Sequence, residues 1–265
     1  VLLLARTDTD AKKHDGLSSF INDMKQPGVE TQPLKQMNGY ASFNQVFLTD
    51  AEVLPDFQVA ELGDGWKVAT TTLMHERRAA DSLRAWGQVP DTDGPIYDQE
   101  RAEVETTMAP YKWYPQRAGR VDLIMQRAKE TGAIKDPAVR QEIAKLMTLH
   151  KSAEWTARRA RSAQEQGKPQ GPEGSLGKLA ASNVARAAAK VHTMISGADS
   201  MLSGDDSPEN GTVAEVLISF PASSIAGGTD EIQKNIISER VLDMPKETRF
   251  DAGKPFKDIP RNTIS

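Results

Sequence analysis

The sequence of 265 residues contains no cysteine, few aromatic residues (6%), no excess of positive charge and no long hydrophobic run. Without cysteine it can form no disulfide, no thiolate metal site and no cysteine nucleophile, which suits a reducing compartment. The formal net charge of −4 disfavours a general nucleic-acid binder, for which a basic domain is expected. The absence of any run of about 18 apolar residues predicts that no segment spans a membrane. A chain of this length can fold as one large domain or as two.

The start of the sequence is abrupt. Val1 is not an initiator methionine, and the run Val1-Leu-Leu-Leu-Ala5 is already strand-like. We therefore expect the natural chain to continue upstream, and a targeting segment there stays open.

Residues 1–61 have the pattern of an antiparallel β region. Short apolar-containing runs at 1–6, 16–24, 29–37 and 43–53 are separated by turn-rich segments. Because no helical pattern lies between them, they predict an antiparallel sheet or part of a barrel.

From Gly63 onward the hydrophobic period becomes helical. The first stripe predicts a helix over about 65–86 and consists of Trp66, Ala69, Leu73, Ala80 and Leu83. Further helices are expected over 117–130, 136–167 and 172–198, with a last one after Thr229.

The predicted fold class is therefore α+β. It consists of a partial antiparallel β-barrel domain over 1–61, followed by an up-down α-helical bundle over 62–245. Residues 246–265 are polar and rich in proline, and we interpret them as a tail that lies over the surface or is disordered.

Glu76 is the one carboxylate that falls on the apolar stripe of the first predicted helix. Burial disfavours the charged form of a carboxyl group, which makes a buried glutamate a competent base near neutral pH. The alternative is a residue at the edge of the stripe that pairs with Arg77, Arg78 or a neighbouring helix. Periodicity alone leaves both interpretations open.

A second candidate is the turn that opens the last helix, Ala226-Gly227-Gly228-Thr229-Asp230-Glu231. The two glycines allow a tight turn or a close approach of a ligand, and Thr229 is a good N-cap. Asp230 and Glu231 suit the positive end of the helix dipole. The free N–H groups of such a turn can hold a phosphate or the polar edge of a cofactor. The alternative is a plain loop that leads into a packed helix.

The histidines give no sign of a metal site. His150 and His192 lie within helical stripes, and neither has a partner at ligand spacing. We therefore expect structural histidines and no bound metal.

Several segments occur together in one order along the chain. They are the strands, Gly63-Asp-Gly-Trp66, Leu73-Met-His-Glu76-Arg77, the helical bundle and the closing segment Ile225 to Arg240. In this combination residues 1–245 resemble the acyl-CoA dehydrogenase family, and the segments 136–141 and 171–179 are similar to bacterial members. The resemblance implies the end of the middle β-domain and the C-terminal helical bundle, without the N-terminal helical domain.

The resemblance implies an FAD-dependent α,β-dehydrogenation of an acyl-CoA thioester to the trans-2-enoyl-CoA. A carboxylate removes the pro-R α-proton, the β-hydride goes to N5 of FAD, and the electrons pass to electron-transfer flavoprotein. Most members carry the catalytic glutamate directly before the Gly-Thr of the closing motif, where this sequence has Gly227. A minority, of the isovaleryl- and long-chain type, carry it on the first bundle helix just before an arginine. The matching residue here is Glu76.

Further roles are implied residue by residue. Gly228 would approach the thioester carbonyl, and Met74 and Arg77 would border the acyl-CoA, although the family usually has an acidic residue at the position of Met74. The FAD-binding residues implied are Thr229, Asp230, Glu231 and Gln141. The Arg-x-x-Phe-Gly segment, through which a neighbouring subunit of the family contacts FAD, is missing around residues 130–134.

The implied assembly is a homo- or hetero-oligomer, a dimer or a tetramer, and with a bacterial source the implied location is the cytoplasm. Two other functions stay open. One is a non-catalytic partner subunit of a heteromeric acyl-CoA dehydrogenase, which Gly227 and the missing Arg-x-x-Phe-Gly segment favour. The other is a related flavin oxidase or monooxygenase.

Overall fold

The structure is a computed structural model that describes residues 1–86, 92–108, 115–168, 171 and 173–260, without the side chains of residues 77–86, 107, 108, 115 and 173. The chain divides into two compact units, each described here by itself. Unit 1 consists of residues 1–36, 41–111 and 247–265, and unit 2 consists of residues 37–40 and 112–246. The boundaries at 61 and 245 stay a prediction from the sequence.

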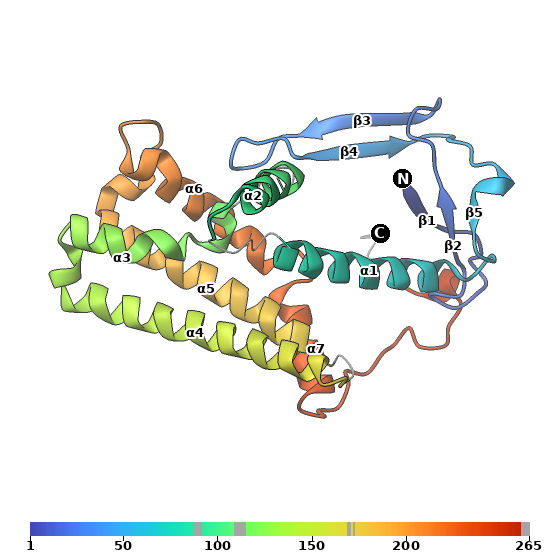
Figure 1. The fold of residues 1–265 in the computed structure, drawn as a ribbon. Helices are drawn as coiled ribbons and strands as arrows, with labels where there is room; N and C mark the ends of the chain where they lie inside the picture. Colours follow the sequence, from blue (N-terminus) through green and yellow to red (C-terminus); the bar gives the residue numbers. More distant parts are fainter. Residues whose placement is uncertain (87–91, 109–114, 169–170, 172, 261–265) are drawn as a thin grey trace. The chain divides into compact units, whose positions relative to one another are not determined.

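The strands of unit 1 pair only with antiparallel neighbours. They are β1 (Leu2–Arg6), β2 (Leu17–Ile21), β3 (Val29–Leu34), β4 (Phe43–Leu48) and β5 (Gln58–Val59). One sheet has the order β1-β2-β5, and β3 pairs with β4 in a separate hairpin (Figure 1). The predicted antiparallel pairing is confirmed.

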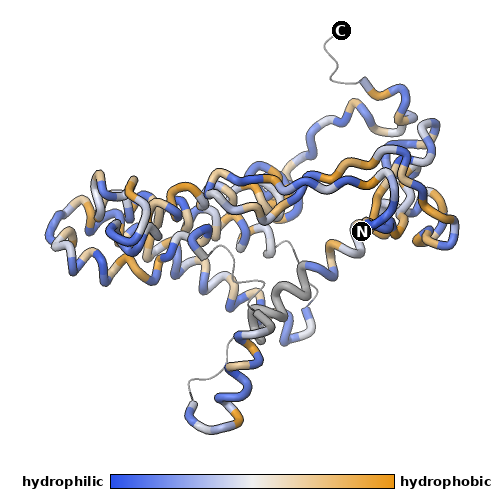
Figure 2. The backbone as a smooth tube through the Cα atoms, turned by 90° about the horizontal axis from the view of Figure 1, so that it is seen from above, coloured by the Kyte–Doolittle hydropathy of each residue, from blue (hydrophilic) through white to orange (hydrophobic). Residues whose placement is uncertain are grey.

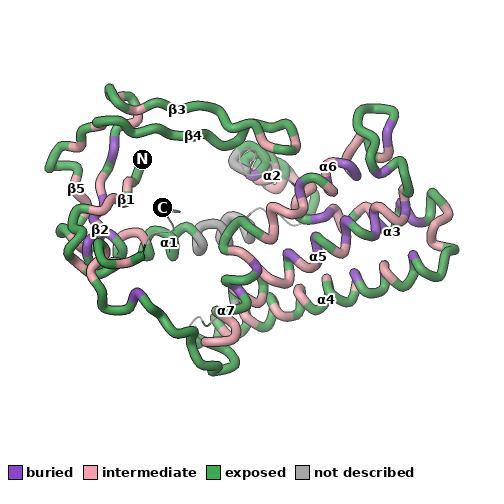
Figure 3. The backbone as a smooth tube through the Cα atoms, turned by 180° about the vertical axis from the view of Figure 1, so that it is seen from behind, coloured by how far each residue is buried: buried purple, intermediate pink, exposed green. Residues whose placement is uncertain are grey.

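The prediction of a partial barrel needs correction. The described strands form two small separate sheets and close no barrel. β5 is only two residues long and pairs with β2 at two positions, so the first sheet ends there. Nearly all residues of β3 and β4 are exposed on both faces (Figure 3). Without a buried face, this hairpin lacks the packing that curls a sheet into a barrel.

Unit 1 also contains α1 (Gly65–Trp86) and α2 (Pro95–Met108). α1 has the predicted bounds, and β2 fixes its start. The hydroxyl of Ser18 accepts a hydrogen bond from the N–H of Gly63 (3.0 Å), and Ser19 donates to the carbonyl of Gly65 (3.3 Å). A Cβ at Gly65 would lie 2.6 Å from the Cα of Ser18, so only glycine fits at this contact.

The last described residues pack against the loop between β1 and β2, within unit 1. The N–H groups of Phe256 and Lys257 donate to the carbonyls of Ala11 (2.9 Å) and Thr9 (3.0 Å). The guanidinium of Arg6 lies 3.5 Å from the centre of the Phe256 ring, a cation–π contact.

Unit 2 is helical. Its helices are α3 (Val121–Glu130), α4 (Pro137–Glu165), α5 (Glu173–Ser196), α6 (Thr212–Ser219) and α7 (Asp230–Arg240). The carboxylate of Asp136 accepts from the N–H of Ala138 (2.7 Å), with Pro137 in the first turn, so the predicted start of α4 is confirmed. The predicted helical bundle is present.

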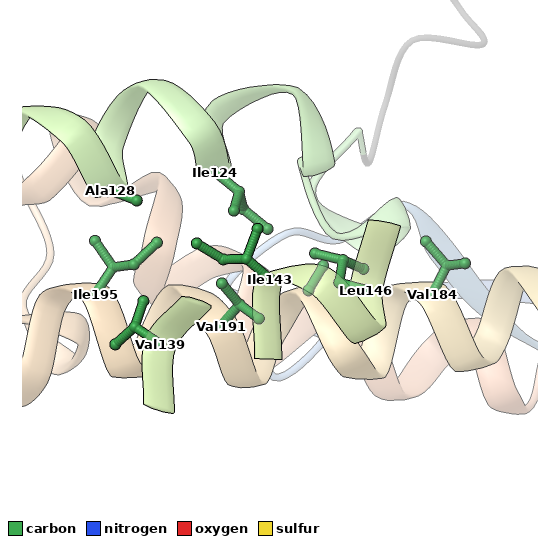
Figure 4. Close-up of a cluster of buried hydrophobic side chains, with 9 residues drawn as sticks. Ile124, Ala128, Val139, Ile143, Leu146, Val184, Val191 and Ile195 are labelled. Atoms are coloured by element: carbon green, nitrogen blue, oxygen red, sulfur yellow. The ribbon is translucent and has the colours of Figure 1, made fainter. Parts of the chain in front are cut away.

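The core of unit 2 lies where α3, α4 and α5 meet. The side chains labelled in Figure 4 come from the three helices and point toward one another. The buried residues of this core are Ile124, Ala128, Val139, Ile143, Leu146, Val184, Ala188, Val191 and Ile195. Buried positions gather along α3 and α5 in Figure 3.

Hydrophilic and hydrophobic residues alternate closely along the helices in Figure 2. Accordingly, no helix in the described part of the chain is long and apolar enough to cross a bilayer.

Candidate functional site

The Gly227-Gly228-Thr229 turn stands at the start of α7 in unit 2. Gly227 and Gly228 have φ angles of 70° and 92°, in the left-handed region that favours glycine. The hydroxyl of Thr229 accepts from the N–H of Ile232 (3.3 Å), which confirms the predicted N-cap. Both glycines are exposed, and a Cβ at Gly227 would meet no atom within 4 Å. The turn therefore offers backbone N–H groups and the positive end of a helix dipole to open space.

Gln233 holds this turn from within α7. Gln233 is 7% exposed, and its Nε2 donates to the carbonyl of Gly227 (3.1 Å) and, more weakly, to that of Gly228 (3.5 Å). A Cβ at Gly228 would lie 2.6 Å from Nε2. Sequence reasoning did not identify Gln233 as a site residue. Its only signal was a polar residue four positions after the N-cap.

The carboxylate of Asp230 is buried against α5. Its two oxygens lie 3.2 Å from Lys178 Nζ and 3.1 Å from Arg186 Nη2. Burial alone would raise the pKa of Asp230, but polar contacts with Ser182, Lys178 and Arg186 outweigh it and lower the pKa to about 2. The carboxylate is therefore ionised, and both its oxygens are engaged with α5.

The candidate residues on α1 belong to unit 1. Glu76 is exposed, as are Trp66 (42%), Leu73 (50%) and Met74 (41%), so the apolar stripe is not buried over its described part. The side chain of Arg77 lies outside the described residues. The assignment of Glu76 as the base therefore stays a prediction from the sequence.

The remaining candidates lie in unit 2. Gln141 is exposed on the second turn of α4, and Glu231 is exposed on the first turn of α7. These residues and the candidates on α1 belong to different units.

A second buried polar cluster surrounds His192, which is fully buried. Arg127 Nη1 lies 3.1 Å from His192 Nδ1, and because a guanidinium only donates, Nδ1 accepts. The proton therefore sits on Nε2, which faces the carbonyls of Gly119 (3.1 Å) and Arg120 (3.2 Å). Burial, together with the charge of Arg127, lowers the pKa of His192. These contacts agree with the expected structural role.

The backbone donors of the turn suit the polar edge of a flavin cofactor. The described residues contain no group of three or more His, Asp or Glu side chains that could hold a metal ion. The exposed Gly-Gly turn offers neutral N–H donors, and a Cβ at Gly227 would meet no atom within 4 Å, which fits the polar edge or phosphates of FAD.

Comparison with known proteins agrees with this fold. Residues 117–242 match the model of the acyl-CoA dehydrogenase C-terminal domain. The chain is 29% identical to the acyl-CoA dehydrogenase IpdE1 of Mycobacterium tuberculosis, over 93% of this chain and 56% of that protein. The chain thus spans about half the length of this relative.

Two solved structures share the fold. The Tcur3481-Tcur3483 steroid ACAD superimposes with a TM-score of 0.69 at 21% identity, over 92% of this chain and 56% of the other. The ChsE4-ChsE5 complex from Mycobacterium tuberculosis gives a TM-score of 0.62 at 20% identity, over 93% of this chain and 57% of the other. Residues 117–242 thus form a C-terminal domain of the acyl-CoA dehydrogenase family, and the relative named above is an acyl-CoA dehydrogenase as well.

Proposed function

We propose that the full-length protein is an FAD-dependent dehydrogenase that oxidises an acyl-CoA thioester to the trans-2-enoyl-CoA. The observation that carries the proposal is the Gly227-Gly228-Thr229 turn at the start of α7, whose two glycines are exposed and which lies inside a C-terminal domain of this family. Its left-handed glycines and free helix-start N–H groups suit a cofactor and a thioester carbonyl.

Within this proposal, FAD supplies the acceptor for the hydride that leaves the β-carbon. The backbone of Thr229, Asp230 and Glu231 binds the cofactor through the start of α7, and Gln141 contributes a side-chain amide. Asp230 acts through its N–H group, because its carboxylate is bound to Lys178 and Arg186. Gly228 approaches the thioester carbonyl, where the absence of a side chain permits close contact.

The proton at the α-carbon goes to Glu76. Gly227, which occupies the usual position of the family's base, has no group that can accept a proton. Glu76 is a carboxylate on α1, and in family members of the isovaleryl and long-chain type the base precedes an arginine, as Glu76 precedes Arg77 here. Met74 and Arg77 border the acyl-CoA. Electron-transfer flavoprotein would be the partner that accepts the electrons.

The proposal is tested by replacing the base in the full-length protein. We expect Glu76→Gln to keep its bound flavin and to lose a factor of about 10²–10⁴ in turnover, which is typical for removal of a general base. The matched control is Glu103→Gln, because Glu103 is an exposed glutamate on α2 that accepts a hydrogen bond from Gln99 (2.8 Å). Unchanged turnover in Glu76→Gln would contradict the assignment.

A second candidate function is a non-catalytic subunit that completes the site of a partner chain. Gly227 favours it, and so do the solved relatives, since ChsE4-ChsE5 is a complex of two proteins. The full-length protein purified alone would reject this function if it contained stoichiometric FAD that a substrate reduces.

A panel of straight-chain, branched and steroid-bearing acyl-CoA thioesters would define the substrate. The steroid-bearing thioesters are included because one solved relative is a steroid ACAD.

A further inference from the structure

A polar stripe on α5 faces the segment that leads into the turn. Lys178, Ser182 and Arg186 are spaced by four residues and therefore lie on one side of the helix. Ser182 donates to the carbonyl of Ser223 (2.8 Å), and Arg186 donates to the hydroxyl of Ser224 (2.9 Å). α5 thus holds the chain just before the two glycines.

The same stripe holds the chain just after them. Lys178 and Arg186 both contact the carboxylate of Asp230, whose side chain is only 6% exposed. A buried carboxylate is stable only when charged or polar partners replace its water. Asp230 is therefore bound tightly to α5, and residues 223–230 are fixed at both ends.

Gln233 restrains the two glycines themselves. Because its amide donates to the carbonyl of Gly227 and contacts that of Gly228, it fixes the direction of both peptide groups. The carbonyls point toward the buried amide, so the chain between them cannot rotate freely. Glycine is otherwise the residue with the greatest backbone freedom, and a turn of two glycines needs such restraints to keep one conformation.

We infer that Gln233, Asp230, Lys178 and Arg186 are positioning residues that hold the Gly227-Gly228 turn in one conformation before any ligand binds. Their effect on cofactor affinity rests on the proposed function, whereas their effect on the turn does not. A preformed turn binds a ligand without an ordering cost, so loosening it weakens binding although none of the four side chains needs to touch the ligand.

The test compares Gln233→Leu with Gln126→Leu in the full-length protein. Leucine is close to glutamine in size and removes only the amide. Gln126 is the matched control because it is an exposed glutamine on α3 that donates to Glu130 (2.8 Å). Loss of one such hydrogen bond corresponds to roughly a two- to tenfold change in the equilibrium constant for opening of the turn. We expect amide hydrogen exchange of residues 223–230 to quicken by that factor in Gln233→Leu, with residues 236–240 unchanged.

We further expect FAD affinity of Gln233→Leu to fall by a similar factor and the visible spectrum of the bound flavin to shift. A merely structural residue would lower the melting temperature without moving that spectrum. Arg186→Gln is the second variant, because its side chain is 52% exposed and its loss leaves Lys178 on Asp230. Arg186→Gln should also quicken amide hydrogen exchange of residues 223–230 and weaken FAD binding, by a smaller factor than Gln233→Leu.

Each outcome decides one claim. Unchanged exchange in Gln233→Leu overturns the inference, whatever happens to the flavin. Faster exchange with unchanged FAD affinity and spectrum overturns the positioning role and leaves the proposed function intact. A wild-type protein that holds no flavin overturns the proposed function, while the exchange data still decide whether the turn is held by these side chains.

Discussion

His192 shows how one buried side chain makes stability depend on pH. In the folded state its Nδ1 accepts from Arg127, which requires the neutral ring, and burial lowers its pKa below the usual 6.5. The unfolded chain therefore binds a proton first as the pH falls. We expect the free energy of unfolding to be highest above about pH 6.5 and to decline below it. The measurement is the midpoint of urea denaturation at pH values from about 7.5 to 5.

The His192→Gln variant should lose this part of the pH dependence, because an amide does not titrate. His150→Gln is the matched control, since His150 is a half-buried histidine of α4, and it should keep the wild-type slope. If the urea midpoint of the wild-type protein stayed constant from about pH 7.5 to 5, this would contradict the conclusion that His192 is neutral in the folded protein.

At the scale of elements, the contact of α3, α4 and α5 should carry much of the stability of unit 2. Leu146 is fully buried in this core, and Leu149, one turn later on α4, is 40% exposed. We expect Leu146→Ala to cost about 2–5 kcal/mol of unfolding free energy through lost burial and a cavity. Leu149→Ala should stay within about 0.5 kcal/mol in the same denaturation experiment. Equal costs for the two variants would place the core elsewhere.

Helices with a periodic apolar pattern over many turns and clear start signals were predictable from the sequence. α1 and α4 begin where Gly65 and Asp136 indicated, because both carry stripes over many turns. α2 and α6 were missed for opposite reasons. α2 buries only Val104 among its described side chains, so it has little apolar pattern. α6 is eight residues long and largely apolar, which leaves no period to detect.

The pairing of strands was not predictable. Alternation shows which residues share a face of a strand, but it does not say which strand lies beside it. The β1-β2-β5 sheet therefore differs from the expected part of a barrel, although β1 to β4 lie within their predicted ranges.

The same limit applies to the candidate site. The Gly-Gly-Thr turn and its N-cap follow from a local pattern. The contacts that hold Asp230 come from Lys178 and Arg186, 52 and 44 residues earlier, and no local pattern reveals them.

At the scale of the whole molecule, the chain returns to unit 1 after α7. Residues 251–258 contact the loop between β1 and β2, and the half-buried Phe256 ring anchors them under Arg6. We expect Phe256→Ala to release this segment and to speed limited proteolysis between residues 246 and 260 by about tenfold, because one aromatic contact is lost. Phe250→Ala is the control, since that ring is 68% exposed, and it should leave the cleavage rate unchanged. Slow cleavage in both variants would show that the backbone hydrogen bonds hold the segment alone.

The central claim is that the full-length protein dehydrogenates an acyl-CoA through FAD with Glu76 as the base. It is tested most directly by mixing the purified flavoprotein with acyl-CoA thioesters without oxygen and following the visible absorbance of the flavin. We predict rapid bleaching in the wild-type protein and in Glu103→Gln, and a flavin that stays bound and oxidised in Glu76→Gln. Equal bleaching in Glu76→Gln and the wild-type protein, or no bleaching of the wild-type flavin by any thioester of the panel, would contradict the account.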